Sequence, residues 1–197
     1  KNTAAQCLVS EFGFVSIAFA DSLKDACSAI FSWDRQMLEG DTDESRIWRE
    51  QIDKWWAEKL QIPHFTPRWA LQHFGTDIMR HAFNDEIWLL NVERKINEMG
   101  PSQNIVITDS RFMNEAALIR KFNGKIYRVK RGDEPEWLSV AVAANNGDIT
   151  AKKELENRKI HTSEYEWIGA DIDACFENDG DTEYLWKQIR ETISKDL

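Results

Sequence analysis

Four short runs of apolar and β-branched residues stand out along the chain. They are FVSIAF (14–19), NIVIT (104–108), KIYRVK (125–130) and IDACFE (172–177). Each run is compact and is bounded by polar or glycine-containing segments, so each predicts a short strand, and FVSIAF predicts a buried one. Helical patterns lie between these runs. Strands that alternate with helices predict an α/β fold with a parallel sheet covered by helices on both faces.

The remaining periodic segments predict the helices. Residues 2–12 have apolar positions at helical spacing, and Gly13 follows as a C-cap. Ser22 and Asp25 have the spacing of a capping box at the start of the next helix. We expect helices over 2–12, 22–33, 67–80, 84–98, 112–122 and 181–195, one continuous amphipathic helix over 43–60, and a helical excursion in the polar stretch 131–161.

Residues 34–100 interrupt the alternation of strands and helices, because they are helical and lie between two predicted strands. We expect them to form an inserted substrate-binding subdomain, and residues 1–33 and 101–197 to form the core. The first helix has no strand before it, and the sequence begins with Lys rather than Met. We therefore expect that the first strand of the sheet lies in a preceding segment that the sequence does not include.

Composition narrows the class of protein. The chain has 25 Lys and Arg against 34 Asp and Glu, and its net charge of −9 without a basic tract disfavours a protein that coats DNA or RNA. No apolar stretch approaches the roughly 18 residues that a membrane helix needs. Cys7, Cys27 and Cys175 are widely spaced and odd in number, which predicts free thiols in a reducing cytoplasm rather than a disulfide framework or a zinc site.

Lys1, Asn2 and Thr3 stand at the head of the first predicted helix. A phosphate-binding loop places a Lys and a Ser or Thr there, so that Lys1 would reach the β- and γ-phosphates and the Thr3 hydroxyl would hold Mg²⁺. The helix N-terminus would add its partial positive charge. The sequence does not contain most of the diagnostic glycines, and three residues at a chain end also fit a frayed terminus. The residues alone leave both interpretations open.

The predicted strand at 104–108 leads into Asp109, Ser110 and Arg111. Ligands of open α/β sheets bind beyond the carboxyl ends of strands, so Asp109 could orient a hydroxyl or a Mg²⁺-bound water, and Arg111 could bridge phosphate oxygens. In the structural alternative, Asp109 caps the following helix and Arg111 is a surface charge. Sequence pattern weighs the two about equally.

The segment 66–80 places Gly75, Thr76 and Asp77 inside a helical pattern, where glycine is costly. A close approach or a break is expected there, although a plain core helix also fits. Among nine tryptophans, most are expected to pack, and Trp88 is the candidate for stacking on a nucleobase. An acidic protein that binds a polyanion must gather its cations in one cleft, and the candidates are Lys24, Arg35, Arg68, Arg111, Lys130, Arg131 and Arg158.

Six segments together resemble a known family. They are FADSLKDA (19–26), DRQMLEGDTDESRIWRE (34–50), TPRWALQHFGTDIMR (66–80), ITDSRFMNEA (107–116), HTSE (161–164) and FENDG (176–180). In this order they resemble the deoxynucleoside monophosphate kinases of tailed bacteriophages, a branch of the P-loop nucleoside monophosphate kinase superfamily. Lys1, Asn2 and Thr3 are similar to the end of that family's Gly-Lys-Asp-Thr phosphate loop, with Asn2 in place of Asp.

The resemblance implies a three-layer parallel sheet of P-loop kinase type with a helical insert that binds the nucleoside monophosphate. It also implies transfer of the γ-phosphate of ATP to a deoxynucleoside monophosphate (dNMP) with Mg²⁺, which supplies phage DNA synthesis in the cytoplasm of the infected bacterium. Neither a nucleic acid polymer nor a membrane is implied as a partner, and the resemblance allows a homodimer. Residues 131–160 would correspond to a lid.

The resemblance also implies roles for single residues. The implied catalytic residues are Lys1, Arg111 and Arg131. The implied ATP-binding residues are Lys1, Asn2, Thr3, Ala4, Asn178 and Gly180, with Thr3 on the metal. The implied dNMP-binding residues are Leu23, Lys24, Arg35, Arg68, Gly75, Thr76, Trp88, Asp109 and Glu115. No role is implied for His161, Ser163 and Glu164.

Two other hypotheses remain from the sequence. One is a different small-molecule P-loop kinase of the dephospho-coenzyme-A kinase type, which the Asn178-Asp179-Gly180 turn would suit equally. The other is a non-catalytic nucleotide-binding protein without a working phosphate loop.

Overall fold

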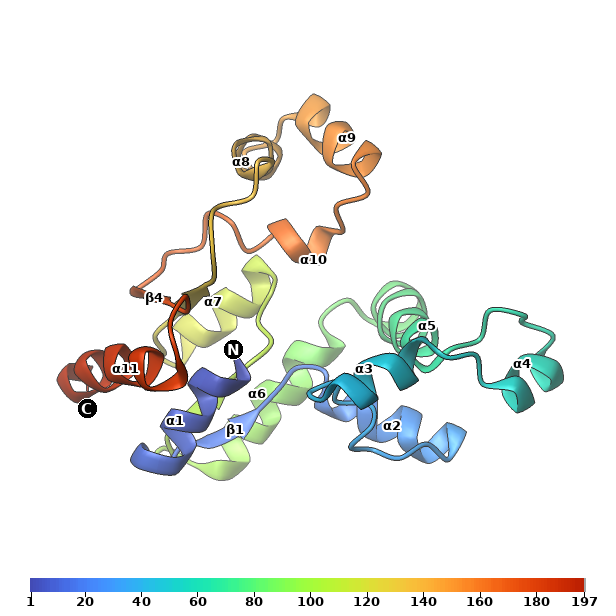
Figure 1. Cartoon of the computed structure of the whole chain (residues 1–197), viewed down its shortest axis with the longest axis horizontal. Helices are drawn as coiled ribbons and strands as arrows, with labels where there is room; N and C mark the ends of the chain where they lie inside the picture. Colours follow the sequence, from blue (N-terminus) through green and yellow to red (C-terminus); the bar gives the residue numbers. More distant parts are fainter. Residues whose placement is uncertain (197) are drawn as a thin grey trace. The chain divides into compact units, whose positions relative to one another are not determined.

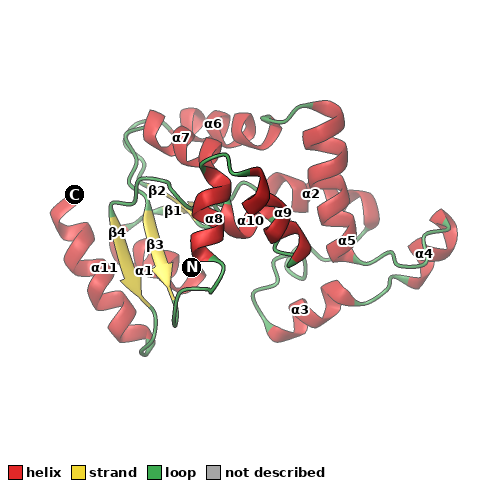
Figure 2. Cartoon of the chain, turned by 90° about the horizontal axis from the view of Figure 1, so that it is seen from above, coloured by secondary structure: helices red, strands yellow, loops and turns green. Residues whose placement is uncertain are grey.

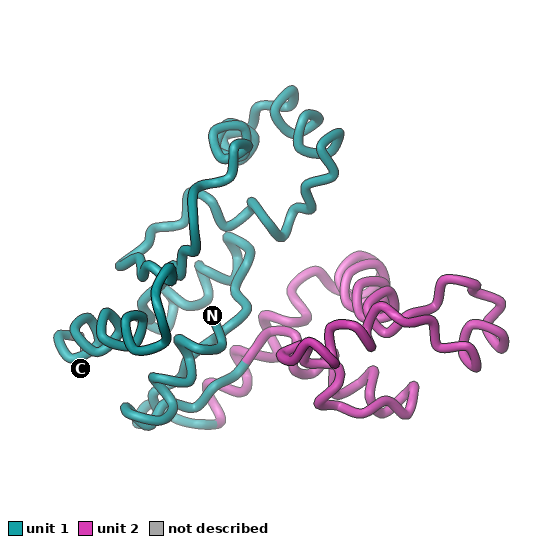
Figure 3. Tube along the Cα trace, viewed as in Figure 1, with its two compact units in different colours: residues 1–17, 99–197 teal, residues 18–98 magenta. Residues whose placement is uncertain are grey.

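The computed structural model describes residues 1–196 and divides into two compact units (Figure 3). Unit 1 comprises Lys1–Ile17 and the chain from Met99 onward, and unit 2 comprises Ala18–Glu98. Residues 18–33, which we expected in the core with residues 1–17, therefore group with the helical segment. The reason is packing, because Leu23, Cys27 and Phe31 are buried in one cluster with residues of that segment.

The strands of unit 1 form two parallel pairs (Figure 2). β1 (Val15–Ile17) pairs with β2 (Ile105–Ile107), and β3 (Tyr127–Lys130) pairs with β4 (Ala174–Glu177). All four predicted strands and their parallel direction are confirmed, so the chain is an α/β protein. The expected continuous sheet is not present within residues 1–196. Each pair is only three or four residues long, and the two pairs are not hydrogen-bonded to each other.

Side chains of both strand pairs enter one core. Val106 of β2 and Phe176 of β4 pack in the same cluster as buried residues of α1 (Asn2–Phe12) and α11 (Thr182–Asp196), among them Leu8 and Ile189. Both helices were predicted, and so was α7 (Met113–Lys121), whose inner face contains Ala116 and Leu118. Gly13 ends α1 in the left-handed conformation, as predicted, with φ of 69°.

The polar stretch after β3 folds into three helices, drawn in orange in Figure 1: α8 (Leu138–Asn145), α9 (Ile149–Asn157) and α10 (Thr162–Tyr165). They enclose a small core of their own, which includes Ala141, Leu155 and Tyr165. The Asn145 amide closes it by donating to the carbonyls of Tyr165 and Ile168 at 2.9 and 2.7 Å. The predicted helical excursion is therefore present as a separately packed subdomain of unit 1.

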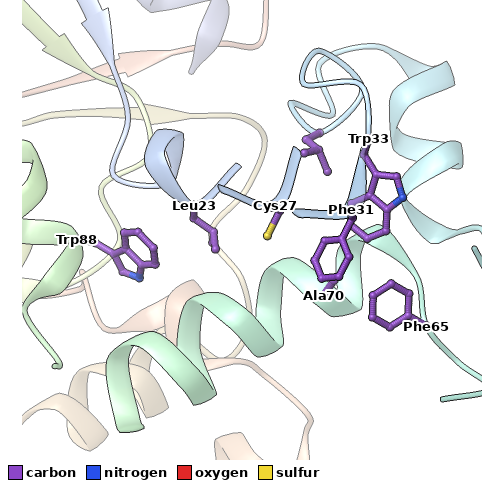
Figure 4. Close-up of a cluster of buried hydrophobic side chains, with 8 residues drawn as sticks. Leu23, Cys27, Phe31, Trp33, Phe65, Ala70 and Trp88 are labelled. Atoms are coloured by element: carbon purple, nitrogen blue, oxygen red, sulfur yellow. The ribbon is translucent and has the colours of Figure 1, made fainter. Parts of the chain in front are cut away.

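Unit 2 is helical. Its elements are α2 (Asp21–Phe31), α3 (Asp43–Glu50), α4 (Lys54–Leu60), α5 (Pro67–Gln72), the π-helix η1 (His73–Phe83) and α6 (Ile87–Met99). An aromatic core joins them, and Figure 4 shows Phe31, Trp33 and Phe65 converging beside Ala70. The Phe31 and Phe65 rings meet edge to face, with centroids 5.3 Å apart.

The single helix predicted over 43–60 is wrong. It breaks at Gln51–Asp53, because Asp53 becomes the N-cap of α4 and accepts from the Trp56 amide at 3.1 Å. The other carboxylate oxygen of Asp53 accepts from the Trp33 indole at 2.8 Å. Of the six apolar positions that suggested one buried face, Trp48 and Trp56 pack against the core, whereas four are exposed: Ile47, Ile52, Trp55 and Leu60.

The predicted capping box at Ser22 is also wrong. Ala20 is the N-cap of α2 and forms no side-chain cap, whereas Ser22 donates to Asn91 of α6 at 2.7 Å. Within residues 1–196, no helix combines the length and the apolar character that crossing a membrane would require.

Candidate active site

The first turn of α1 is open to a ligand. Lys1 is its N-cap, no side chain caps the helix, and the turn contains no acidic residue. The first hydrogen bond within the helix runs from the Ala5 amide to the Lys1 carbonyl, which leaves the amides before Ala5 without partners inside the helix. Thr3 is exposed, and Ala4 packs into the core of unit 1. A helix start of this kind, with a positive dipole end and no carboxylate, fits an anion.

Lys1 lies within electrostatic range of charged groups from distant parts of unit 1. Desolvation lowers the pKa of its ammonium, and the Arg111 guanidinium lowers it further, while carboxylates at Asp109, Glu164 and Glu115 act in the opposite direction. The structure thus brings together Lys1, Arg111 and Asp109, three of the residues predicted for the site.

Arg111 is held by the segment 161–164. Its Nη1 donates to Glu164 Oε1 at 2.9 Å and is 3.5 Å from the Ser163 carbonyl oxygen. His161 starts α10 as its N-cap and accepts from the Ser163 amide at 3.2 Å, so this short helix presents Glu164 to Arg111. Sequence reasoning gave Glu164 no role. The match to the HTSE segment was the only signal, and nothing in the sequence linked it to Arg111.

Glu115 is 2% exposed and holds the start of α7. Its Oε2 accepts from the backbone amides of Arg111 and Phe112 at 2.7 and 3.2 Å. This oxygen therefore fixes the turn that aims Arg111. A direct contact of Glu115 with substrate stays a prediction.

The ends of β3 and β4 bring a second group of predicted residues together. The Asn178 amide donates to the Lys130 carbonyl at 2.7 Å, and Asp179 accepts from the Gly132 amide at 2.6 Å. Arg131 thereby lies beside the turn predicted to contact adenine. Arg131 is exposed and forms no hydrogen bond or ion pair with any residue from 1 to 196. Gly180 allows close packing there, since a Cβ at this position would be 2.9 Å from the Tyr184 ring.

In unit 2, Lys24 and Arg35 converge on the same carboxylate. Glu39 accepts from Lys24 Nζ at 2.5 Å and forms a short ion pair with Arg35. Asp25 adds a 2.5 Å contact to Arg35, and the Lys24 side chain is only 14% exposed. The two cations predicted for dNMP are therefore side by side and neutralised by carboxylates.

Leu23, Gly75 and Trp88 form another contact group in unit 2. The Trp88 indole donates to the Gly75 carbonyl at 3.0 Å, and a Cβ on Gly75 would lie 2.6 Å from Leu23 Cδ2. Leu23 and Trp88 belong to the same buried cluster, which Figure 4 shows. Trp88 is 8% exposed, which favours packing over stacking on a base. Thr76, on η1, is partly exposed. Contacts of Trp88, Gly75 and Thr76 with dNMP stay predictions.

Arg68 stands apart from these groups on the surface of unit 2. It begins α5 after Pro67 and donates to Glu50 of α3 at 2.9 Å. The predicted dNMP residues of unit 2 thus occupy three places: the Lys24 and Arg35 pair, the Leu23, Gly75 and Trp88 contact, and Arg68.

The residues at the start of α1 fit the magnesium-bound triphosphate that the family resemblance implies. They offer an ammonium, a hydroxyl at Thr3, the backbone amides of the first helical turn and, at Asp109, a carboxylate within range of Lys1. Among the described residues, no group of three or more His, Cys, Asp or Glu could hold a metal by itself. The chemistry of this donor set suits a cation that arrives with phosphate oxygens, as Mg²⁺ does.

Comparison with known proteins identifies the family. A model of the family described as deoxynucleotide monophosphate kinase matches residues 30–139. A putative deoxynucleotide monophosphate kinase of Acanthamoeba polyphaga mimivirus is 25% identical over 192 residues, which cover 90% of this chain and 91% of that protein. A deoxynucleoside-5′-monophosphate kinase of Escherichia phage T5 is 41% identical over 58 residues, 29% of this chain and 23% of that protein. The family match extends over more than half of the sequence, and this chain therefore belongs to the deoxynucleotide monophosphate kinase family.

Proposed function

We propose that this protein transfers the γ-phosphate of ATP to a deoxynucleoside 5′-monophosphate and releases ADP and the deoxynucleoside diphosphate. Family membership supports the reaction class. The structural observation that supports it best is the convergence of Lys1 and Arg111, which are far apart in sequence, at the uncapped start of α1. Phosphoryl transfer depends mainly on positioning and on neutralising charge, and this arrangement supplies both.

The donor triphosphate would occupy the start of α1. Lys1 would contact the transferring phosphate, and the backbone amides of Asn2, Thr3 and Ala4 would donate hydrogen bonds to phosphate oxygens. Arg111 would move from Glu164 to the phosphate, because a dianionic or trianionic partner attracts a guanidinium more strongly than one carboxylate does. Arg131 is unpaired within residues 1–196 and would contact the phosphates from the end of β3. Asn178 and Gly180 would line the adenine side.

Magnesium is part of this proposal. Thr3 would hold the ion through its hydroxyl, with Asp109 orienting a water of its coordination sphere. The bound ion would supply neutralisation of charge on the β- and γ-phosphates.

The reaction itself forms one bond and breaks one. A phosphate oxygen of dNMP attacks the γ-phosphorus, and the bond from that phosphorus to the oxygen bridging to the β-phosphorus breaks, so that ADP leaves with the bond's electron pair. Lys1 and Arg111 would stabilise charge on the transferring group and on the departing oxygen. Glu115 would act as a positioning residue by holding the turn at Arg111.

The acceptor dNMP would bind through the groups placed in unit 2. Contacts of Asp109 and Glu115 with dNMP stay predictions from the family resemblance. Lys24 and Arg35 would exchange Glu39 for substrate oxygens, and Gly75 and Thr76 would present backbone and hydroxyl groups. On this view residues 18–98 form the substrate-binding insert and the rest forms the kinase core, with 131–160 as a lid. The finer fold proposed for this core is the three-layer sheet of P-loop kinases.

The biological setting is proposed on the same basis. The product would supply DNA synthesis of a bacteriophage in the cytoplasm of its bacterial host, and the active form would be a homodimer. The proposal requires no nucleic acid polymer as a partner.

The test is an ADP-release assay with ATP, Mg²⁺ and each of the common dNMPs, run on the full-length protein. At least one dNMP should give sustained turnover that chelation of Mg²⁺ abolishes. Dephospho-coenzyme A serves as the control substrate and should not be phosphorylated. If no dNMP supports ADP release above the ATP-only background, the proposed function is wrong.

A further inference from the structure

An open depression lies on unit 2 where α3 meets the start of α5. It has a volume of about 540 Å³ and is lined by Arg46, Ile47, Arg49, Glu50, Gln51 and Arg68. This volume is within the range of about 300–1,000 Å³ that is usual for small-molecule sites. Three of the six lining residues are arginines, in a chain whose net charge is −9. Such a local excess of positive charge in an acidic protein points to an anionic ligand.

Arg49 is the unusual residue of this depression. Its guanidinium presses so closely on Gly40 that a Cβ there would lie 2.0 Å from Arg49 Nη2, and Gly40 also has a φ of 72°. The Arg49 Nε is buried and has no hydrogen-bond partner within residues 1–196. The neighbouring Arg46 behaves differently, because it donates to the carbonyls of Gly40 and Asp41 and to the Asp43 carboxylate. Arg46 therefore secures the loop, and Arg49 is left with unused donors.

The charged groups of the depression favour the binding of a further negative charge. Burial lowers the pKa of Arg49, and the positive charge of Arg68 lowers it further. Glu50 and Asp41 act in the opposite direction, but the Arg49 Nε donates to neither of them. Glu50 is instead bonded to Arg68 Nη1 at 2.9 Å. Two guanidinium groups thus share the surroundings of one carboxylate, and each retains N–H donors that fit phosphate oxygens.

We propose that this depression is an oxyanion site in which Arg49 and Arg68 together hold the phosphate group of the acceptor deoxynucleotide. The assignment rests on the function proposed above, and it adds Arg49, which the sequence did not single out, as a substrate-binding residue. Gly40 has a positioning role, because any side chain there would displace the Arg49 guanidinium. The shared chemistry is a phosphate monoester dianion, so inorganic phosphate is a minimal probe of the same site.

The test measures binding to the full-length protein by isothermal titration calorimetry. Arg49→Gln should weaken dNMP binding by about tenfold to a hundredfold, the range expected for losing hydrogen bonds to a charged group. The affinity for the matching deoxynucleoside, which lacks the phosphate, should not change. Arg49→Lys should recover part of the loss, since it keeps the charge without the planar fork. Arg94→Gln is the matched control, because Arg94 is an exposed arginine of the same unit paired with Glu98, and it should bind dNMP normally.

A second measurement uses the wild-type protein, so it does not require that an Arg49 variant folds. In ¹H–¹⁵N spectra of the arginine side chains, the Arg49 Nε–H resonance of the wild-type protein should shift on titration with inorganic phosphate or dNMP, and not with the deoxynucleoside. Either of two results would show that the proposed oxyanion site is wrong. One is a dNMP affinity of Arg49→Gln within about twofold of wild type, and the other is an Arg49 Nε–H resonance that does not shift with phosphate.

The two proposals fail in different ways. If the protein turns over dNMP but Arg49 responds to neither phosphate nor dNMP, the oxyanion site is wrong and the kinase function stands. If no dNMP is phosphorylated but phosphate still shifts Arg49 and Arg49→Gln abolishes this binding, the oxyanion site stands without the kinase function. A response to ATP alone would show that the site takes the donor, and would overturn its assignment to the acceptor.

Discussion

Arg111 owes its position to two carboxylates with different tasks. Glu115 is buried and binds the backbone at the start of α7, and Glu164 is exposed and pairs with the guanidinium. The first interaction sets the turn from which the side chain leaves. The second is a pair that a phosphate can replace, because exposed ion pairs are worth little.

Arg111→Ala should reduce kcat for dNMP phosphorylation by about a hundredfold or more, as expected for losing one strong contact in the transition state. The Arg111 side chain is 42% exposed, so the melting temperature should stay close to that of the wild type. Steady-state kinetics and thermal melting check both expectations, with Arg94→Ala as the control. A folded Arg111→Ala protein of normal kcat would remove Arg111 from the mechanism.

Glu115→Ala should reduce the free energy of unfolding by about 1–3 kcal/mol, because two backbone amides would lose a buried acceptor. Chemical denaturation measures this loss. Glu191→Ala, at an exposed position in α11, should stay within about 0.5 kcal/mol of wild type. Equal stability of the two variants would show that Glu115 does not anchor α7.

At the scale of elements, α3 and α4 are separate because of one aspartate. Asp53 caps α4, accepts from the Trp33 indole and donates its amide to the Phe65 carbonyl at 3.0 Å. The last two contacts tie the break to the aromatic core. The helical pattern over 43–60 is compatible with one helix. The contacts that the chain makes with the aromatic core by turning at residue 53 stabilise the break more than a continuous helix would.

Asp53→Ala should therefore destabilise the protein by about 1–3 kcal/mol, through loss of the cap and of the acceptor for Trp33. Asp53→Asn retains a carbonyl oxygen and should lose less. Asp43→Ala removes an exposed acidic residue from the first turn of α3 and provides the control, with an expected change of less than about 1 kcal/mol. Urea denaturation compares the three variants. An Asp53→Ala protein as stable as the control would show that the break has another cause.

The π-helix η1 brings Gly75 against α2, and this contact can be tested as a pair. Gly75→Ala should cost about 1–3 kcal/mol, because the new Cβ would overlap Leu23 Cδ2 in a buried contact. Leu23→Ala removes the overlapping atom, so the double variant should be less destabilised than the sum of the single variants. Denaturation of all four proteins gives the coupling. Additive losses would indicate that Gly75 and Leu23 do not restrict each other.

For the whole molecule, the division into two units predicts where each substrate slows hydrogen exchange. A non-hydrolysable ATP analogue should slow exchange by about tenfold or more, at saturation, in segments 1–5, 109–116 and 178–182. A dNMP should instead slow exchange in segments 22–25, 46–51 and 68–77 of unit 2. Sodium chloride at the same ionic strength is the control. Protection by dNMP confined to unit 1 would contradict the proposed role of unit 2.

Local pattern determined most elements of this protein. The four strands, their parallel direction and most helices follow from apolar periodicity and from turn residues such as Gly13, because these depend on neighbours within a few positions. The segment motifs around Gly75 and Arg111 identified the family, which the comparison confirms. The errors at Ser22 and over 43–60 arose where a distant partner, Asn91 or Trp33, decided the local structure.

The amino-acid sequence by itself thus determined the elements, the α/β class and the family, since each is encoded in short-range order. Only the tertiary structure decided which charged groups meet. Arg111 lies within electrostatic range of Lys1 and pairs with Glu164, and Lys24 and Arg35 pair with Glu39, although no periodicity records that these residues are close. The burial of the Arg49 Nε without a partner is likewise visible only in the structure. The physical reason is that charge interactions depend on distance and burial in space, which follow from how the whole chain packs.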